Sequence, residues 1–227
     1  MASDRTLESP HPLVECRDVS LQYDNLSVLR DVSFTIFGSE IRAVVGEHGA
    51  GKTSLAKLLA GYVRPTFGTV RLAGSSYSFL TPARAMELGI ELVSQQTPVV
   101  DDFSVAENIL LNTRSFARGS FVHHRKRLHY VGDLLSRLDI DLDPTASLRS
   151  LKLSDRVLVD ILKHTHSHPR LLILDEALEK LTAANLRRII THLLDLRQSG
   201  TAILFVTHRI DDIYGFADRV SIIRHGT

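Results

Sequence analysis

The sequence predicts an α/β fold: a mainly parallel sheet, with an antiparallel β subdomain at the start of the chain and an inserted α-helical subdomain. Strand-like apolar runs alternate with helix-forming segments before residue 98 and after residue 166. Between these limits the apolar spacing is helical and there is little strand pattern. Strand–helix alternation favours a parallel sheet whose ligand lies at the carboxyl ends of the strands.

The bulk composition is that of an ordinary globular chain. Its 227 residues are 44% hydrophobic, which is ample for a buried core. We interpret 1–227 as a single domain with the helical subdomain at about 98–166. The net charge is only +1, so nucleic acid is not an expected partner. Cys16 is the only cysteine, which rules out an internal disulfide and fits a reducing compartment.

The chain begins with two strand-like segments. Apolar residues alternate over 13–19 and again over 28–36, which predicts two half-buried strands. A turn around Asp24 and Asn25 connects them, so we expect them to pair antiparallel.

A glycine-rich phosphate-binding pattern follows. Residues 46–53 read G-x-x-x-x-G-K-T, between a strand run at 41–45 and a helix run at 54–60. Glycines allow backbone N–H groups to surround phosphate oxygens, and the helix start adds its positive dipole end. Lys52 is expected to reach the β- and γ-phosphates and Thr53 to bind Mg²⁺, so the core is predicted to be a P-loop NTPase that binds the phosphates of a nucleotide together with Mg²⁺. The predicted cofactor-binding residues of this segment are Gly46, His48, Gly49, Ala50, Gly51, Lys52, Thr53 and Ser54.

The remaining elements are predicted from periodicity. Strands are expected at 68–74, 171–174, 202–206 and 220–223, and helices at 83–88, 105–111, 130–138 and 157–162. No internal repeat interrupts this order.

Two carboxylates follow the apolar run 171–174. Asp175 at the strand end is suited to hold Mg²⁺ beside Thr53, and Glu176 is suited to orient or deprotonate an attacking water. This is the Walker B arrangement. His208 follows the strand run 202–206 and so projects from the same carboxyl edge, where an imidazole can contact a γ-phosphate.

With these residues the chain resembles the ATP-binding cassette family over about 13–226, particularly its sugar and nucleoside importers. By this resemblance Gln95, in the segment 89–96, is the glutamine that senses Mg²⁺ and water. Tyr23 lies where the family stacks an aromatic ring on adenine, although it can equally pack on the antiparallel sheet. The resemblance thus implies that Glu176, His208, Lys52 and Gln95 are catalytic and that Thr53, Gln95 and Asp175 hold the metal.

One family motif is degraded. The family's LSGGQ signature falls on Leu151–Asp155 in a register without gaps, and there the serine and both glycines are replaced. A rival register begins the motif at Leu153 but needs a two-residue deletion. The residues after Glu176 also lack the family's Pro-Thr. We therefore expect one partner of an asymmetric pair, with an intact phosphate site and a degraded signature that slows hydrolysis by the isolated chain.

The resemblance implies an ATP-hydrolysing subunit that powers import of a small polar solute (sugar, nucleoside or vitamin). Its partners would be integral-membrane permease subunits, a second cassette ATPase domain and, indirectly, a solute-binding protein. The chain would lie peripherally at the cytoplasmic face of the inner or plasma membrane. Its last residues stop just after a strand and turn, which favours the N-terminal half of a longer tandem protein. The alternatives are a soluble, non-transport cassette ATPase and a regulatory nucleotide-binding module.

Overall fold

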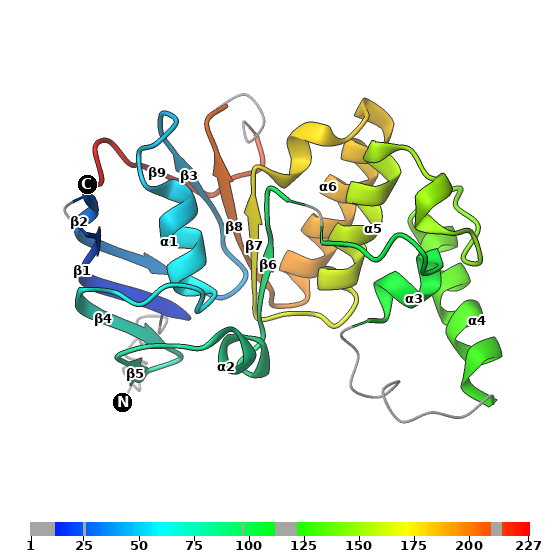
Figure 1. The fold of residues 1–227 in the computed structure, drawn as a ribbon, viewed down its shortest axis with the longest axis horizontal. Helices are drawn as coiled ribbons and strands as arrows, with labels where there is room; N and C mark the ends of the chain where they lie inside the picture. The colour runs from blue at the N-terminus through cyan, green and yellow to red at the C-terminus, as the bar shows by residue number, and fades with distance from the viewer. Residues whose placement is uncertain (1–11, 25, 97, 112–121, 210–214) are drawn as a thin grey trace, which may run out of the picture.

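A computed structural model of the chain describes residues 12–24, 26–96, 98–111, 122–209 and 215–227. Two β-sheets lie side by side, and helices pack between them and at one end (Figure 1). The strand orders are β2-β1-β4-β5 in one sheet and β6-β7-β8-β3-β9 in the other. This is the predicted α/β architecture.

The four-stranded sheet is antiparallel throughout. Val14 pairs with Ile36 across the first two strands, as alternating half-buried runs predict. The strand predicted at 68–74 also joins this sheet, where Val14 pairs with Leu72. The last strand was not predicted, because three mainly exposed residues give almost no hydrophobic pattern. The bounds are β1 (Val14–Tyr23), β2 (Leu26–Ile36), β4 (Phe67–Leu72) and β5 (Ser75–Tyr77).

The five-stranded sheet is parallel. Its two central predicted strands are buried along their whole length, which is why they read as continuous apolar runs. Alternate residues of these strands enter two separate apolar clusters, one on each face of the sheet. The bounds are β3 (Ile41–Val45), β6 (Ile90–Val93), β7 (Leu171–Asp175), β8 (Ala202–Thr207) and β9 (Arg219–Ile222).

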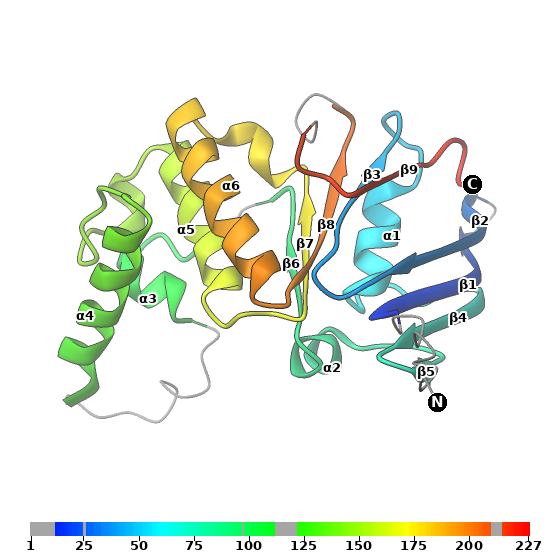
Figure 2. The same cartoon turned by 180° about the vertical axis from the view of Figure 1, so that it is seen from behind.

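Each face of the parallel sheet is covered by different elements. Helix α1 (Lys52–Leu59) lies between the two sheets, and its buried Leu55 and Leu59 join strands of both in one cluster (Figure 1). Helices α5 (Leu153–Thr165) and α6 (Ala183–Gln198) cover the opposite face (Figure 2). The short α2 (Pro82–Glu87) leads into β6. Because β3, β7 and β8 run parallel to one another, their carboxyl ends lie along one edge of the sheet.

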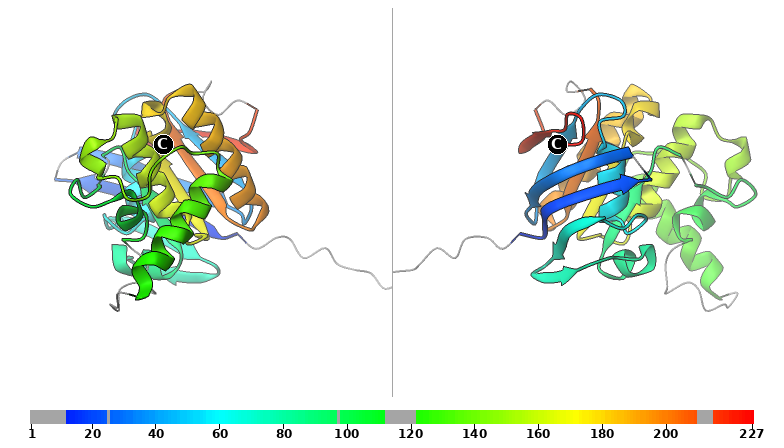
Figure 3. Two further views of the ribbon diagram at one scale, coloured as in Figure 1. Left: turned by 90° about the vertical axis from the view of Figure 1, so that its right-hand side faces the viewer. Right: turned by 60° about the vertical axis from the view of Figure 1, so that its left-hand side comes forward.

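The helical insertion lies between β6 and β7. It contains α3 (Val105–Ile109), α4 (Val122–Arg137), the 3₁₀ turn η2 (Leu148–Ser150) and α5. Helix α3 begins at a capping box, in which Ser104 and Glu107 exchange side-chain and backbone hydrogen bonds. Buried residues of α3, α4 and α5 share one apolar cluster with the sheet. In Figure 3 the insertion lies at the end opposite the antiparallel sheet.

The predicted helices are found at the expected positions in the chain, but their lengths differ from the prediction. Helix α3 stops at Ile109 and so is shorter than the predicted 105–111, whereas α5 extends well beyond 157–162 at both ends. Within the described residues, no helix combines the length and the apolar character needed to span a bilayer.

Candidate functional site

The glycine-rich loop connects β3 to α1 and depends on two glycines for different reasons. Gly51 has a φ of 103°, in the region that favours glycine, and a Cβ there would lie 2.7 Å from the carbonyl oxygen of Val28. A Cβ on Gly46 would lie only 2.3 Å from the carbonyl oxygen of Ile223. The loop is thus fitted against the backbone of β2 on one side and of the chain after β9 on the other.

The chain after β9 is bonded to this loop. The backbone N–H of Gly226 donates to the carbonyl of Ala50 at 3.2 Å, and the Gly226 carbonyl accepts from the N–H of Arg30 at 2.7 Å. Ile223 donates to the carbonyl of Val45 at 2.8 Å, where β3 ends. These bonds hold the phosphate loop between segments from both ends of the sequence.

Lys52 lies beneath the loop with 4% of its surface exposed. Its Nζ donates to the carbonyl oxygens of Gly46 and Glu47 at 2.8 and 2.9 Å. Helix α1 starts here, and no side chain among the described residues caps it, so its first N–H groups face the loop interior. A buried ammonium beside an uncapped helix start is an anion-binding arrangement.

The predicted metal ligands Thr53 and Asp175 are in direct contact. Thr53 Oγ1 donates to Asp175 Oδ1 at 3.1 Å. Burial raises the pKa of Asp175, and the neighbouring Glu176 carboxylate adds to that rise, while the Thr53 hydrogen bond opposes it. A hydroxyl and a carboxylate at this spacing fit Mg²⁺, which prefers oxygen ligands, and its charge would hold Asp175 ionised.

Glu176 follows directly and is almost fully buried. Gln95 Nε2 donates to its Oε2 at 2.7 Å, and His208 Nδ1 lies 3.4 Å from its Oε1. The backbone of Glu176 is left-handed, with a φ of 51°, and its N–H donates to the carbonyl of Val206 at 2.9 Å. Such a conformation is uncommon outside glycine and costs on the order of 1 kcal/mol, so the surrounding contacts hold this carboxylate in place.

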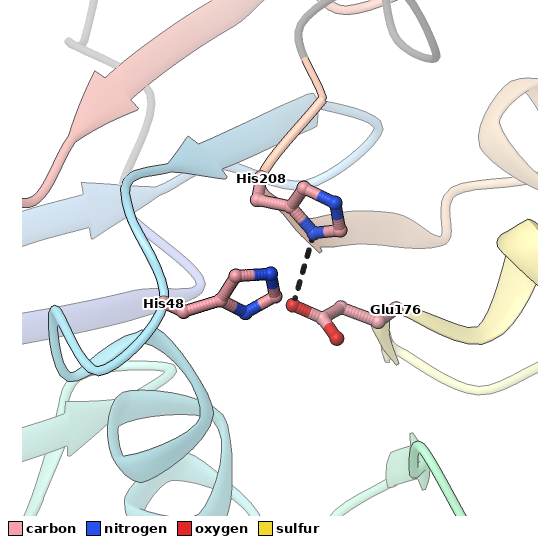
Figure 4. Close-up of side chains that lie close together, drawn as sticks. All are labelled: His48, Glu176 and His208. Atoms are coloured by element: carbon pink, nitrogen blue, oxygen red, sulfur yellow. Dashed lines mark hydrogen bonds and ion pairs between the residues drawn. The ribbon is translucent and has the colours of Figure 1, made fainter.

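His48 extends from the phosphate loop toward the same carboxylate (Figure 4). The ring centroids of His48 and His208 are 4.5 Å apart, with the planes tilted by 42°. His48 therefore contacts the groups at the strand ends as well as forming part of the loop.

Most of the predicted site residues line one cavity of about 240 Å³ beside the loop. Its walls are Val28, His48, Gly49, Gly51, Lys52, Thr53, Ser54, Gln95 and Glu176. Tyr23 is not among them: it ends β1, pairs with Leu26 and is 44% exposed. Adenine stacking on Tyr23 stays a prediction, as do the roles of the other residues.

Two residues of this neighbourhood were not predicted. Glu179 Oε1 lies 3.3 Å from His208 Nδ1, and Lys180 Nζ donates to the backbone carbonyl of Gln95 at 2.6 Å. Both belong to the 3₁₀ turn η3 (Ala177–Lys180), which starts at the left-handed Glu176. One sequence feature could have pointed to these contacts. The residues just after Glu176 depart from the family pattern, and this departure puts charged side chains on the turn.

The segment predicted to carry the degraded signature lies at the start of α5. Ser154 Oγ accepts hydrogen bonds from the Thr182 N–H at 2.9 Å and from Asn185 Nδ2 at 3.2 Å, so its hydroxyl is engaged by the start of α6. Leu153 is 59% exposed, and Lys152 is the N-cap residue of α5. Both registers of the signature stay predictions.

The chain matches known proteins over most of its length. A family model described as "ABC transporter" matches residues 29–179. The chain is 36% identical over 217 residues to the ribose import ATP-binding protein RbsA 2 of Streptomyces avermitilis, and 35% identical over 215 residues to RbsA 1 of Streptomyces coelicolor. These alignments cover 96% and 95% of this chain but 43% of each relative.

Solved structures agree on the fold. An ATP-binding cassette of an ABC transporter in its ADP conformation superposes with a TM-score of 0.79 at 19% identity, covering 95% of this chain and 89% of that one. A cassette in a post-hydrolysis state with ADP and Pi superposes with a TM-score of 0.81 at 19% identity, covering 94% and 95%. The family match and the sequence relatives together show that this chain belongs to the ABC transporter family.

Proposed function

We propose that this chain is the ATP-binding and ATP-hydrolysing part of an ABC importer for a small polar solute. Among such solutes, the relatives reported above favour a sugar. The observation that carries the proposal is the contact between Thr53 and Asp175, which places the phosphate loop against the Walker B carboxylates. Gln95 and His208 contact the second of these carboxylates, Glu176, from two further elements. This is the set of groups that phosphoryl transfer to water requires.

In the proposed reaction the loop N–H groups and Lys52 bind the β- and γ-phosphates. Mg²⁺, held by Thr53, Gln95 and Asp175, would neutralise charge on the phosphates. Glu176 accepts a proton from water as the water attacks the γ-phosphorus in line, and the bond to the β-γ bridging oxygen breaks. His208 donates to the γ-phosphate and so stabilises the developing charge. Gln95 now donates to Glu176, so if it held Mg²⁺ instead, the Glu176 carboxylate would be free to accept a proton from water.

The transport role rests on the relatives. Those reported above are named ribose import ATP-binding proteins. We infer that permease subunits in a membrane, and through them a solute-binding protein, are the partners, and that the chain acts peripherally at the cytoplasmic face. Val100 and Phe103 precede α3 with exposed apolar surface suited to such a permease contact.

A second cassette domain is part of the proposal. The chain spans 43% of the length of the relatives reported above, as one of two cassettes in tandem would. In the gap-free register Lys152 takes the place of the signature serine, and in the rival register Ser154 does, but the Ser154 hydroxyl is bonded to the start of α6. We therefore infer that the partner supplies the working signature for the ATP held by this chain.

The test compares the assembled transporter with wild-type chain and with Glu176→Gln. We expect the variant to bind ATP but to lose solute-stimulated hydrolysis and uptake by about 10²–10⁴-fold, since a general base contributes that much. Glu87→Gln, which alters an exposed carboxylate on α2, is the matched control. Unchanged turnover with Glu176→Gln would contradict the proposal and favour the regulatory module. Full activity without any membrane subunit would favour the soluble ATPase.

A further inference from the structure

Three metal-ligating side chains converge at the edge of the phosphate site: His48, Glu176 and His208. Their ligand atoms all lie within 4.8 Å of one another, and Figure 4 shows the two rings and the carboxylate meeting from three different loops. We propose that they bind one transition-metal ion of the Zn²⁺ type in the nucleotide-free chain, and that this ion blocks hydrolysis. The inhibition rests on the proposed ATPase function, whereas the binding of the metal does not.

The donor set distinguishes this site from the magnesium site. Two imidazoles and one carboxylate suit Zn²⁺ and its neighbours, whereas Mg²⁺ prefers oxygen ligands. Three protein ligands with a fourth position left to water is a common arrangement of Zn²⁺ at catalytic sites. Mg²⁺ is expected at Thr53 and Asp175, whose donors are all oxygen.

The geometry is close to what the ion needs. Zn²⁺ bonds of about 2.0–2.2 Å in a tetrahedral arrangement put neighbouring ligand atoms about 3.3–3.5 Å apart. His208 Nδ1 and Glu176 Oε1 are already at 3.4 Å. The His48 ring stands 4.5 Å from the His208 ring between centroids, and His48 is exposed, so a small side-chain rotation brings it into place.

The surroundings orient the carboxylate for this role. Gln95 Nε2 binds Oε2 of Glu176 and leaves Oε1 directed at His208. Glu179 adds a second carboxylate 3.3 Å from His208 Nδ1. Hydrogen bonds of this kind fix ligand orientation and raise metal affinity.

Phosphate binding does not explain the imidazole at position 48. That residue occupies one of the four open positions of G-x-x-x-x-G-K-T, where the backbone contacts phosphate and the pattern requires no particular side chain. The ring of His48 contacts the ring of His208, which lies in a loop 160 residues later in the chain. A metal shared by the two loops gives this contact a chemical role.

The consequence is competition with turnover. Glu176 and His208 are the residues proposed to activate water and to contact the γ-phosphate. An ion bound by both withdraws the proton acceptor and ties the two loops together. Zn²⁺ at concentrations that saturate the site is therefore expected to inhibit hydrolysis, and a chelator is expected to restore it.

The experiment titrates the nucleotide-free chain with Zn²⁺ in a calorimeter and with Co²⁺ by its visible d–d absorption, which reports four-coordinate N/O ligation. Wild type is expected to bind one ion per chain. His48→Asn and His208→Asn are each expected to weaken binding about tenfold or more and to abolish the four-coordinate spectrum. His129→Asn, which alters an exposed histidine on α4, is the matched control and should bind as wild type does. Thermal melting of each variant verifies that it is folded.

Each outcome decides the matter. Equal Zn²⁺ affinity in His48→Asn and wild type, or no stoichiometric binding by wild type, would overturn the site and leave the three side chains as an ordinary ion-pair cluster. The metal titration needs no ATP, so its result does not depend on the proposed ATPase function. A chain that binds Zn²⁺ but ignores nucleotide would refute the ATPase alone, and a chain that hydrolyses ATP but binds no Zn²⁺ would refute the metal site alone.

Discussion

Thr53 and Asp175 are 122 positions apart in the sequence, yet the hydroxyl of one donates to the carboxylate of the other at 3.1 Å. The contact exists because β3 and β7 flank β8 in a parallel sheet, so the loops after β3 and β7 leave the same edge. It joins the first turn of the helix that follows the phosphate loop to the strand end that carries both acids. Several measurable consequences follow from this edge and from the residues packed around it.

Thr53→Val removes the hydroxyl while keeping the shape of the side chain. We expect the variant to lose most of the Mg²⁺-dependent part of its ATP affinity, because one oxygen ligand is gone and Asp175 loses the hydrogen bond that opposes the rise in its pKa. Fluorescent-nucleotide titrations with and without Mg²⁺ measure this. Thr191→Val, on the exposed side of α6, is the control. An unchanged Mg²⁺ effect would place the metal elsewhere.

Lys52→Ala removes the ammonium that lies under the loop. A hydrogen bond to a charged group contributes about 1.5–3 kcal/mol, so we expect nucleotide affinity to fall about 10- to 150-fold. Lys57→Ala, an exposed lysine on the same helix, should leave affinity within about twofold of wild type. Equal losses in both variants would show that net charge alone, and not the position of Lys52, determines binding.

Gly46→Ala tests the close approach between the phosphate loop and the chain after β9. The added methyl would lie 2.3 Å from the Ile223 carbonyl oxygen, so the backbone must shift. We expect about 1–3 kcal/mol of destabilisation in urea unfolding and weaker ATP binding. Gly38→Ala is the matched control, because a Cβ there has no neighbour within 4 Å. Wild-type stability in Gly46→Ala would mean that the two segments separate readily.

His192 on α6 predicts a pH dependence of stability. Its Nε2 lies 3.0 Å from Thr165 Oγ1 inside the protein, and burial lowers its pKa from 6.5 to about 4. A depressed histidine pKa means that the unfolded chain binds the proton first. The contribution of neutral His192 to the free energy of unfolding is therefore complete above pH 6.5 and is lost progressively as the pH falls toward 4.

For His192 this loss amounts to about 2 kcal/mol between pH 7 and pH 5. His192→Gln cannot titrate, so its unfolding free energy should decline by about that much less over the same interval. Urea denaturation at the two pH values measures the difference, and His129→Gln, an exposed histidine, controls for the substitution. Identical pH slopes in wild type and His192→Gln would contradict the assignment.

The sequence predicts best where several signals coincide. Strand β7 has a wholly buried apolar run and ends on Asp175, so composition, length and the terminal acids agree. Strand β6 was not predicted because it has only four residues, two of them buried, and its one partner within the described part of the chain is β7, 81 residues later. That pairing is a property of the assembled sheet and leaves no local pattern.

The site shows the same division. Lys52 and Thr53 are fixed by a local motif whose spacing determines its geometry. The contacts of Glu179 and Lys180 depend on the left-handed backbone of Glu176. A glutamate rarely adopts this conformation, so the sequence did not predict it. The approach of His48 to His208 depends on the parallel pairing of β3 with β8. Non-local contacts of this kind become visible only in the structure.

The bonds from Ile223 and Gly226 to the loop after β3 bear on how the protein is made. A nascent chain has the full glycine-rich motif once residue 53 leaves the ribosome, but the backbone that supports it is synthesised about 170 residues later. Such long-range closure is slow relative to local helix formation. A growing polypeptide therefore carries the glycine-rich motif long before residues 223–226, whose backbone bonds hold the loop in its final shape, have been made.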